Sequence, residues 1–478
     1  MIKVFFFSIL FLTISFSQNT FHQLDSYCGQ YVKRNSLPSL SAGLIGDNKI
    51  VWTSYTGTTD LENDIPVTKY SLYRIASISK SITAVATMQL VEQGKINLDS
   101  SARKYLPFLP QKKWSFTVRQ LLNHTSGIRT YKNDEEFNNK INFKSVYDVV
   151  MYVAKDSLDY QPGTKYVYST LAYNLLAGII ERVSGLSYEE YLQKNIFDVA
   201  GMSATKLDFY NRIIPFRVKG YQKNAQREFE NSPLTDLTIK FPGGGILSTV
   251  EDLLKFGNGL LQFKLIKKET LDSMLTETLL NSGRKIQYGL GLDFGVDKYG
   301  RKFFGHAGGG TGFVSRIMCY PEENVAVAHL INCRDRNLIN VAEELSAIYF
   351  GEKISFPKFS LSDTLTKTAV RFSIDSALTF WQSVEIKKDT SFLISSNEIQ
   401  DFGNDLLTLN KTKDAILVFA KLTETDSTFA PGFIGLSDAY NREGNKGMAL
   451  RNLKKAQKLK PNDVSIQLQI LQIEKEEK

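Results

Sequence analysis

The segment Tyr73-Arg74-Ile75-Ala76-Ser77-Ile78-Ser79-Lys80 decides the fold that we expect for this chain. It joins a serine to a lysine three residues later, and residues at this spacing share one face of a helix. The stretch Ile78–Gln93 has apolar residues at helical spacing, and Gly94 stops the run. The pattern therefore predicts a helix that begins at Ser77 and places Lys80 one turn from the serine hydroxyl.

The pair Ser77 and Lys80 indicates nucleophilic catalysis, although Ser-x-x-Lys occurs five times in the chain. Only the copy at Ser77 opens a strongly patterned helix. A serine hydroxyl is a weak nucleophile and needs an adjacent base. Lys80 can be that base if burial and nearby positive potential lower its pKa. Ser77 can also be a simple helix cap, and this motif alone supports both interpretations equally.

Two further segments follow along the chain. Tyr168-Ser169-Thr170 precedes a predicted helix, Leu171–Val183, and His306-Ala307-Gly308 lies at the end of a predicted strand, Lys302–His306. Together with the Ser77 segment, they resemble the active-site motifs of class C β-lactamases and related low-molecular-weight penicillin-binding serine hydrolases, in the order that this family has them. The resemblance covers about residues 20–350.

The resemblance implies an α+β fold. An antiparallel sheet flanked by helices is expected beside an all-helical lobe, with the active site in the cleft between them. Predicted strands stand at both ends of the region, among them Leu40–Ile45 and Val325–Ile331. This placement implies that the two ends of the region meet in one sheet.

The resemblance also assigns roles to the polar residues. It implies that Ser77 is the nucleophile, Lys80 its base, and Tyr168 a proton relay or general base beside the lysine. Thr170 stands where the class C branch has asparagine. Its hydroxyl can still bond Lys80 or the substrate, but it lacks the paired donor and acceptor of an amide. This departure favours peptidase or esterase activity over efficient β-lactamase activity.

The third segment implies the contacts to the substrate. His306 would orient the substrate and Tyr168, and the small residues Gly308 and Gly309 would let a substrate backbone approach the strand edge. By the same resemblance, the amides of Ser77 and Gly309 would form an oxyanion hole. Such donors contribute roughly 10²–10³ in rate.

The N-terminus has the layout of a secretory signal. Residues 1–17 combine a basic start, an apolar core and small residues at a cleavage point. A membrane anchor is the alternative, but a bilayer span needs about 20 apolar residues and this run is shorter. No later segment is long and apolar enough to span. We expect residues 18–352 to form the hydrolase domain, 353–367 a linker and 368–478 a helical domain, in an exported, periplasmic or secreted protein.

The C-terminal region has a period of 34 residues. Ala415 and Phe419 recur as Ala449 and Leu453, which is typical of tetratricopeptide repeats, where paired helices cross at large and small residues. Such repeats predict a protein partner for this region. An ordinary helical bundle is the alternative.

Composition excludes several other classes of protein. The formal charge of +8 comes from 58 basic and 50 acidic residues that are mostly interspersed, which indicates a mixed solvated surface and no nucleic-acid partner. No His, Cys or carboxylate cluster has metal-ligand spacing, so we expect neither a metal nor a cofactor. We interpret His124 as a structural residue that holds a loop beneath the site. Cys319 and Cys333 are predicted too far apart to bridge, and with Cys28 they are expected to be free.

The sequence thus predicts an exported serine hydrolase that forms an acyl-enzyme on Ser77. Its substrate would be a small molecule or peptide of the D-alanyl peptide, small ester or β-lactam class, and export to the cell envelope favours one derived from the cell wall. The alternative is a non-catalytic binding protein on a penicillin-binding scaffold, which would recruit a partner through its helical repeats. The presence of Ser77, Lys80 and Tyr168 together argues against that alternative, because a retired site needs none of them.

Overall fold

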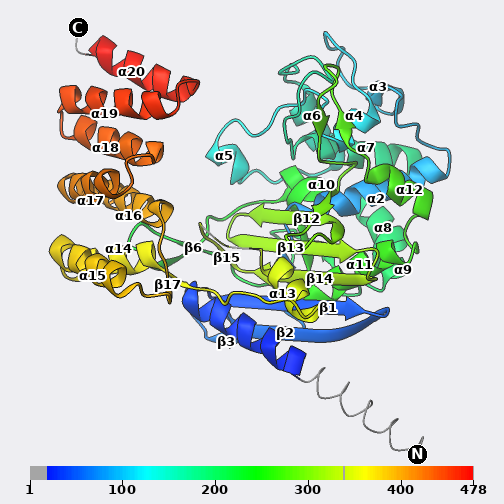
Figure 1. Ribbon diagram of the computed structural model, residues 1–478. Coiled ribbons are helices and arrows are strands. Elements are labelled where there is room, and N and C mark those ends of the chain that lie inside the picture. The colour runs from blue at the N-terminus through cyan, green and yellow to red at the C-terminus, as the bar shows by residue number, and fades with distance from the viewer. Residues whose placement is uncertain (1–18, 337, 339, 477–478) are drawn as a thin grey trace, which may run out of the picture. The chain divides into compact units, whose positions relative to one another are not determined.

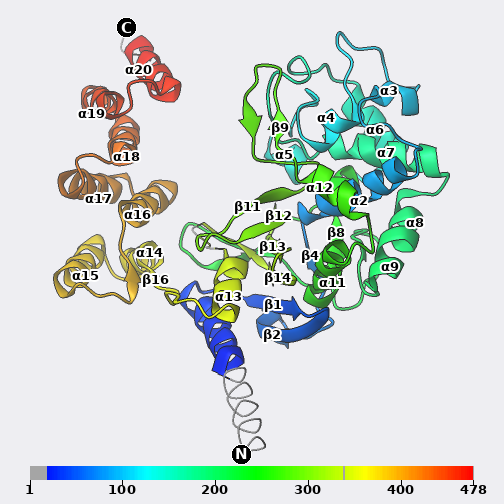
Figure 2. The ribbon, with the colours of Figure 1, turned by 45° about the vertical axis from the view of Figure 1, so that its right-hand side comes forward.

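The computed structural model describes residues 19–336, 338 and 340–476, so the predicted signal, residues 1–17, lies outside the described part. The chain divides into two compact units (Figures 1 and 2). The sheet unit contains the chain up to Gln222 and Asn231–Ser355. The helical unit contains Lys223–Glu230 and the chain from Phe356 onward. None of the described helices combines the length and the apolar character needed to cross a bilayer.

A seven-stranded antiparallel sheet forms the centre of the sheet unit, in the order β11-β12-β13-β14-β1-β2-β3. Strand β1 comes from the start of the unit and β14 from near its end, and they pair with Leu40 opposite Ile331. The prediction that the two ends meet in one sheet is therefore confirmed. The strands are β1 (Ser39–Gly46), β2 (Lys49–Asp60), β3 (Ile65–Pro66), β11 (Asp293–Val296), β12 (Lys302–Gly310), β13 (Phe313–Tyr320) and β14 (Val325–Ile331).

Helices cover both faces of this sheet. The helix at residues 19–34 and α13 (Val341–Tyr349) pack on one face, where Tyr27, Leu44 and Leu345 belong to one apolar cluster. Helices α11 (Val250–Leu261) and α2 (Ile78–Glu92) contact the strands from the other face (Figure 2). Because both faces are covered, every residue of β1 and of β14 is buried. This agrees with the lack of any Asp, Glu, Lys or Arg in either strand.

An all-helical lobe surrounds α2 and completes the fold class expected from the sequence. Helix α2 is buried on nearly all sides, so its polar side chains need partners inside the protein. Thr83 shows how they find them, because its hydroxyl hydrogen-bonds the carbonyl oxygens of Ser79 (2.9 Å) and Pro242 (2.6 Å). The lobe contains α3 (Ala102–Tyr105), α4 (Val118–Leu122), α5 (Asp134–Phe137), α6 (Val146–Ala154), α7 (Ala172–Ser184), α8 (Tyr188–Leu192) and the π-helix Gln193–Phe197.

A smaller sheet brings the catalytic segment to its place. Strand β8 lies between β4 and β5, with Tyr73 opposite Ser248 and Lys206 opposite Leu247. Helix α10 (Phe241–Gly244) directly precedes β8 and therefore lies beside the start of α2. The remaining elements of this unit are β4 (Tyr73–Arg74), β5 (Lys206–Leu207), β8 (Ile246–Ser248), β9 (Thr278–Leu279), β10 (Lys285–Ile286), β15 (Cys333–Arg334), α9 (Asp198–Ala200), α12 (Lys268–Met274) and the 3-10 helix Thr238–Lys240.

The helical unit begins earlier than the sequence predicted. The stretch 353–367 was expected to be a linker, but α14 (Leu361–Arg371) begins within it, capped by the Ser360 hydroxyl. The segment Lys223–Glu230 belongs to this unit because Lys223 and Arg227 both form ion pairs with Asp363, at 2.8 and 2.6 Å. Two short strands cross or border that segment, β6 (Tyr221–Lys223) and β7 (Phe229–Asn231).

The rest of the helical unit consists of paired helices of similar length. Helices α16, α18 and α20 begin at residues 34 apart, and so do α17 and α19, in agreement with the sequence period. The helices are α15 (Ile374–Lys387), α16 (Ser396–Thr408), α17 (Thr412–Thr425), α18 (Ala430–Arg442), α19 (Lys446–Leu459) and α20 (Val464–Glu476). Strand β16 (Phe359–Ser360) precedes α14, and β17 (Phe392–Leu393) lies between α15 and α16.

Candidate active site

Ser77 lies at the N-terminus of α2, but its side chain does not cap the helix. The capping interpretation of this serine is therefore wrong. Ala76, the residue before it, has a φ of +45°, which a residue other than glycine rarely adopts. Such local strain is often found at functional sites. The Ser77 N–H donates to no backbone carbonyl in the described part of the chain, as an oxyanion-hole donor requires.

The Lys80 amine is completely buried and has three oxygen neighbours. Its Nζ lies 3.1 Å from Ser77 Oγ, 3.0 Å from Thr170 Oγ1 and 2.6 Å from the carbonyl oxygen of Gly243. Within the described residues it forms no ion pair with a carboxylate. The pKa of Lys80 is held well below its usual range, mainly by burial and also by the nearby Lys240.

These contacts fit the neutral form of the lysine. A neutral amine has two N–H donors and one lone pair. The Gly243 carbonyl can only accept a hydrogen bond, and the Thr170 hydroxyl can accept the second. The lone pair of Lys80 is then left for the Ser77 hydroxyl, which is the geometry of a base that receives the serine proton.

The approach of the Gly243 carbonyl to Lys80 depends on a glycine at that position. A Cβ at residue 243 would lie 2.6 Å from Thr170 Cγ2 and 2.9 Å from the Thr170 carbonyl oxygen. Any larger residue would therefore push α10 away from the segment that carries Thr170. Gly243 thus completes the set of groups around the lysine.

Tyr168 lies beside the amine of Lys80, whose Nζ is 4.7 Å from the centroid of the tyrosine ring. Burial raises the pKa of Tyr168, and a hydrogen bond with Ser77 acts in the opposite direction. The His124 ring packs against the other side chains of this cluster, 4.2 Å from Tyr168 between centroids. Tyr168 is therefore held in place and neutral near pH 7.

His124 and His306 are joined through Tyr288 in a chain of hydrogen bonds. The Ser169 N–H donates to His124 Nδ1 (3.1 Å), so the proton of the neutral ring is on Nε2, which lies 3.3 Å from the Tyr288 hydroxyl. The Tyr288 hydroxyl then donates to His306 Nε2 (3.0 Å), and His306 Nδ1 donates to the Ala307 carbonyl (2.6 Å). The backbone groups at the two ends fix the donor-to-acceptor direction of every hydrogen bond in this series.

Both histidines are uncharged in this arrangement. Burial is the main cause of the low pKa of His306, which is about 4. Burial also holds the pKa of His124 well below its usual range, and Lys80 adds to this effect. Both ring nitrogens of His306 form hydrogen bonds inside the protein, to Tyr288 and Ala307, and its ring lies 6.3 Å from that of Tyr168 between centroids. Its expected role in orienting the substrate and Tyr168 stays a prediction.

The glycines after His306 lie against the Ser77 segment. A Cβ at Gly308 would lie 2.1 Å from Ser315 Oγ and 2.4 Å from the Ile75 carbonyl oxygen, so only a glycine lets β12 approach so closely. A Cβ at Gly309 would meet no atom within 4 Å. Gly308 is therefore a packing requirement, whereas Gly309 is open to an incoming molecule.

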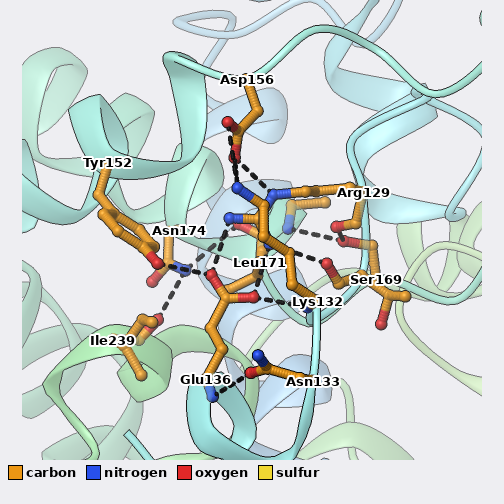
Figure 3. Close-up of polar contacts among 12 residues, drawn as sticks. Arg129, Lys132, Asn133, Glu136, Tyr152, Asp156, Ser169, Leu171, Asn174 and Ile239 are labelled. Carbon is orange, nitrogen blue, oxygen red and sulfur yellow. Dashed lines mark hydrogen bonds and ion pairs between the residues drawn. The ribbon is translucent and has the colours of Figure 1, made fainter. Parts of the chain in front are cut away.

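A loop and the short helix α5, together residues 129–137, form one wall of the site and are fixed by the buried polar cluster in Figure 3. The Arg129 guanidinium makes two hydrogen bonds of 2.8 Å to the Glu136 carboxylate and one of 2.6 Å to Asp156. The Ser169 hydroxyl donates to the Arg129 carbonyl (2.6 Å), and Tyr152 donates to Glu136 (2.7 Å). This cluster therefore ties the loop to the segment that carries Tyr168 and Thr170.

The protein family follows from comparison with known sequences. The family model described as Beta-lactamase matches residues 24–345, which include every site residue described above. The chain belongs to the β-lactamase family of penicillin-binding-like serine hydrolases. It is 28% identical to the mitochondrial serine β-lactamase-like protein LACTB of Mus musculus, over 71% of this chain and 78% of that protein.

One bacterial and one archaeal protein are also similar to this chain. Penicillin-binding protein 4* of Bacillus subtilis (strain 168) is 28% identical over 63% of this chain and 70% of its own length. The octameric penicillin-binding protein homologue of Pyrococcus abyssi has a TM-score of 0.61 and 27% identity, over 72% of this chain and 81% of that chain. The family assignment thus agrees with the resemblance that the three sequence motifs indicated.

In this member of the β-lactamase family, the structure brings Ser77, Lys80 and Thr170 into direct contact. It also adds two residues that sequence reasoning missed as parts of the site. Tyr288 links the two histidines, and Lys240 lines the cavity at Ser77. The only sequence signal for Lys240 is its place directly before the Phe-Pro-Gly-Gly-Gly segment, and nothing in that pattern indicates that a lysine is buried there.

Proposed function

We propose that this chain is an enzyme that hydrolyses a small amide or ester through an acyl-enzyme on Ser77. The observation that carries this proposal is the Lys80 amine, which is 3.1 Å from Ser77 Oγ and has no carboxylate partner in the described part of the chain. A buried lysine that served only to stabilise the fold would be expected to have a counter-charge beside it. Its neutral form is useful as a base.

The proposed reaction has two steps. Ser77 Oγ attacks the substrate carbonyl carbon while its proton moves to Lys80 Nζ, and the resulting oxyanion accepts hydrogen bonds from the amides of Ser77 and Gly309. The bond to the leaving group then breaks, and the leaving group takes a proton from Tyr168 or Lys80. Water attacks the acyl-enzyme in the second step, which releases the carboxylic acid and returns the proton to Ser77.

The pKa shifts divide the proton transfers between Lys80 and Tyr168. Burial lowers the pKa of Lys80, which favours its neutral amine, and raises that of Tyr168, which keeps its phenol protonated. A neutral amine accepts a proton and a neutral phenol donates one. We therefore assign Lys80 as the base that takes the proton of Ser77, and Tyr168 as the acid that protonates the leaving group. Protonated Lys80 can then return a proton to Tyr168.

The substrate class and cellular location are part of the proposal. The sequence motifs favour D-alanyl peptides or small esters, and the name of the Bacillus subtilis relative makes penicillin a reasonable probe. A signal at residues 1–17 would send the protein to the periplasm or outside the cell. We also propose that the helical unit is tetratricopeptide-like and binds a protein partner, which is supported by helices that begin 34 residues apart.

The test is covalent labelling of the purified full-length chain. We would incubate it with a fluorophosphonate and, separately, with a labelled penicillin, and record intact masses. Ser77→Ala should prevent the adduct. Ser282→Ala is the matched control, because Ser282 also begins a Ser-x-x-Lys segment but is exposed, and this variant should label as the wild type does.

The outcomes separate the proposals. A Ser77-dependent adduct establishes the nucleophile, and penicillin labelling would direct the substrate search to D-alanyl peptides. Labelling by the fluorophosphonate alone would direct it to esters and other amides. If neither reagent modifies folded protein, the catalytic proposal is wrong, and the alternative of a binding protein on this scaffold replaces it.

A further inference from the structure

A narrow cavity of about 30 Å³ opens at Ser77. Thr170, Gly243 and Gly309 are among its lining residues, whereas Tyr168 is not. Under the proposed function Tyr168 serves the leaving group, so the leaving group departs on the other side of Ser77. The cavity would then receive the end of the acyl group, the part of the substrate that stays attached to Ser77 between the two steps, because about 30 Å³ has room for one small group such as a carboxylate.

The charged residues that line this cavity are both positive. They are Arg74 and Lys240, and no aspartate or glutamate is among the lining residues. Arg74 has a partner, because its Nε donates to Asp208 at 2.7 Å. Lys240 differs from it, because in the described part of the chain it forms no ion pair. The cavity therefore has an uncompensated positive charge whenever Lys240 is protonated.

Lys240 is held in a fixed position. Its side chain is 5% exposed, its Nζ donates to the Phe137 carbonyl, and the amine lies 4.2 Å from the centroid of the Phe137 ring and 5.1 Å from that of Tyr131. Burial, with the nearby Arg74 as a second cause, lowers the pKa of Lys240 to about 7. An anion beside the amine would reverse this effect and favour the charged form.

A second polar group of the cavity is the Tyr131 hydroxyl. Its oxygen is buried, and it lies close enough to the Thr170 hydroxyl for that group to oppose the rise in the pKa of Tyr131 that burial causes. A ligand oxygen in the cavity would be a further acceptor for this donor. Tyr131 and Phe137 both belong to the segment that the Arg129–Glu136 contacts fix (Figure 3), so this donor is presented by a rigid wall.

We propose that this cavity selects an acyl group that carries a carboxylate, which Lys240 and the Tyr131 hydroxyl bind. The substrates would then be monoamides or monoesters of short dicarboxylic acids, or peptides with an acidic acyl part. This inference rests on the proposed function, because it assumes that Ser77 is acylated. It goes further in naming the charge and the position of the group that the enzyme recognises.

The experiment compares two substrates that differ in one charge. We would measure kcat/KM for mono-4-nitrophenyl glutarate and for its neutral carboxamide analogue, after subtraction of the spontaneous rate. The wild type should prefer the carboxylate by about 10-fold or more, as a charged hydrogen bond allows. Lys240→Met should reduce this preference to about 2-fold or less, and Lys240→Arg should restore part of it.

The ratio of the kcat/KM values for the two substrates separates binding of the anion from the effect of Lys240 on the base. Lys240 also lowers the pKa of Lys80, so Lys240→Met alters the base for both substrates alike, and only the ratio reports the anion. Tyr131→Phe should lower the ratio several-fold. Lys268→Met is the control for net charge, because Lys268 is exposed and forms only an ion pair with Asp272 on its own helix, and the ratio should stay unchanged.

Failure of this inference is distinguishable from failure of the proposed function. Equal kcat/KM values for the two esters in the wild type, or a preference that persists in Lys240→Met, would overturn the inference while fluorophosphonate labelling of Ser77 still occurred. Loss of labelling itself would instead refute the proposed function. The wild-type comparison needs no variant, so it remains decisive even if Lys240→Met does not fold.

Discussion

Replacing Tyr288 by phenylalanine should damage the site without touching any residue that we place in the reaction. The Tyr288 hydroxyl joins His124 Nε2 and His306 Nε2, at 3.3 and 3.0 Å. Tyr288→Phe removes only this oxygen and leaves a buried donor on one ring and a buried acceptor on the other. Each such group costs about 1–3 kcal/mol, so the free energy of unfolding should fall by about 2–6 kcal/mol.

The effect on catalysis follows from the tautomer of His124. Its Nδ1 accepts a hydrogen bond from the Ser169 N–H only while the ring proton is on Nε2. Without the Tyr288 oxygen, the other tautomer becomes competitive, and its Nδ1–H would face the Ser169 N–H. Ser169 lies between Tyr168 and Thr170, so we expect fluorophosphonate labelling of Ser77 to slow by about 10-fold to 100-fold, as small displacements of catalytic groups do.

The measurements are urea unfolding and the labelling rate of each variant. Tyr166→Phe is the matched control, since the Tyr166 ring lies 5.9 Å from that of Tyr288 but its hydroxyl has no hydrogen bond among the described residues. It should change the unfolding free energy by less than about 0.5 kcal/mol. If Tyr288→Phe unfolded at the wild-type urea concentration and labelled at the wild-type rate, the chain of hydrogen bonds would have no role in either property.

Two further predictions concern buried charge. His306 has a pKa of about 4 in the folded state and about 6.5 when unfolded, so only the unfolded chain takes up its proton as the pH falls. Between pH 7.5 and 5.5 this proton uptake should lower the free energy of unfolding by about 1.3 kcal/mol. His306→Asn should abolish this contribution, which urea unfolding of both proteins at the two pH values measures. An equal pH dependence in the two proteins would contradict the prediction. Glu136→Gln should cost about 2 kcal/mol, because Arg129 loses the more buried of its two carboxylate partners and keeps Asp156. Asp99→Asn, at an exposed pair, should cost less than about 1 kcal/mol, and equal losses of the two variants in thermal or urea unfolding would refute this.

Much of the fold could be predicted because local patterns agree with the tertiary structure. The strand predicted at Val325–Ile331 is β14 residue for residue, and the predicted helix at Ile78–Gln93 differs from α2 by one residue at its end. The unusual feature of α2 could not be predicted. Its serines and threonines suggest a solvated face, yet they are buried. Ser81 and Thr83 find acceptors on segments more than 150 residues away, at Gly291 and Pro242.

The site was partly predictable for the same reason. Ser77 and Lys80 are three residues apart, so helical geometry alone places them together. Lys240 has no such local relation to Ser77. It reaches the cavity because α10 follows it and β8 pairs with β4, and both contacts are long-range. A sequence pattern of this kind indicates which residues a helix aligns, but not which distant side chain is buried beside them.

The charges around Ser77 fit one another in a way that no single residue explains. Burial and a second cation lower the pKa of Lys80, and burial near Lys80 lowers the pKa of both histidines in the series of hydrogen bonds. Protonating Lys80 would therefore raise the cost of any other positive charge beside it. It follows that the one favourable new charge in this region is a negative one, which is the charge that develops on the substrate oxygen when Ser77 attacks.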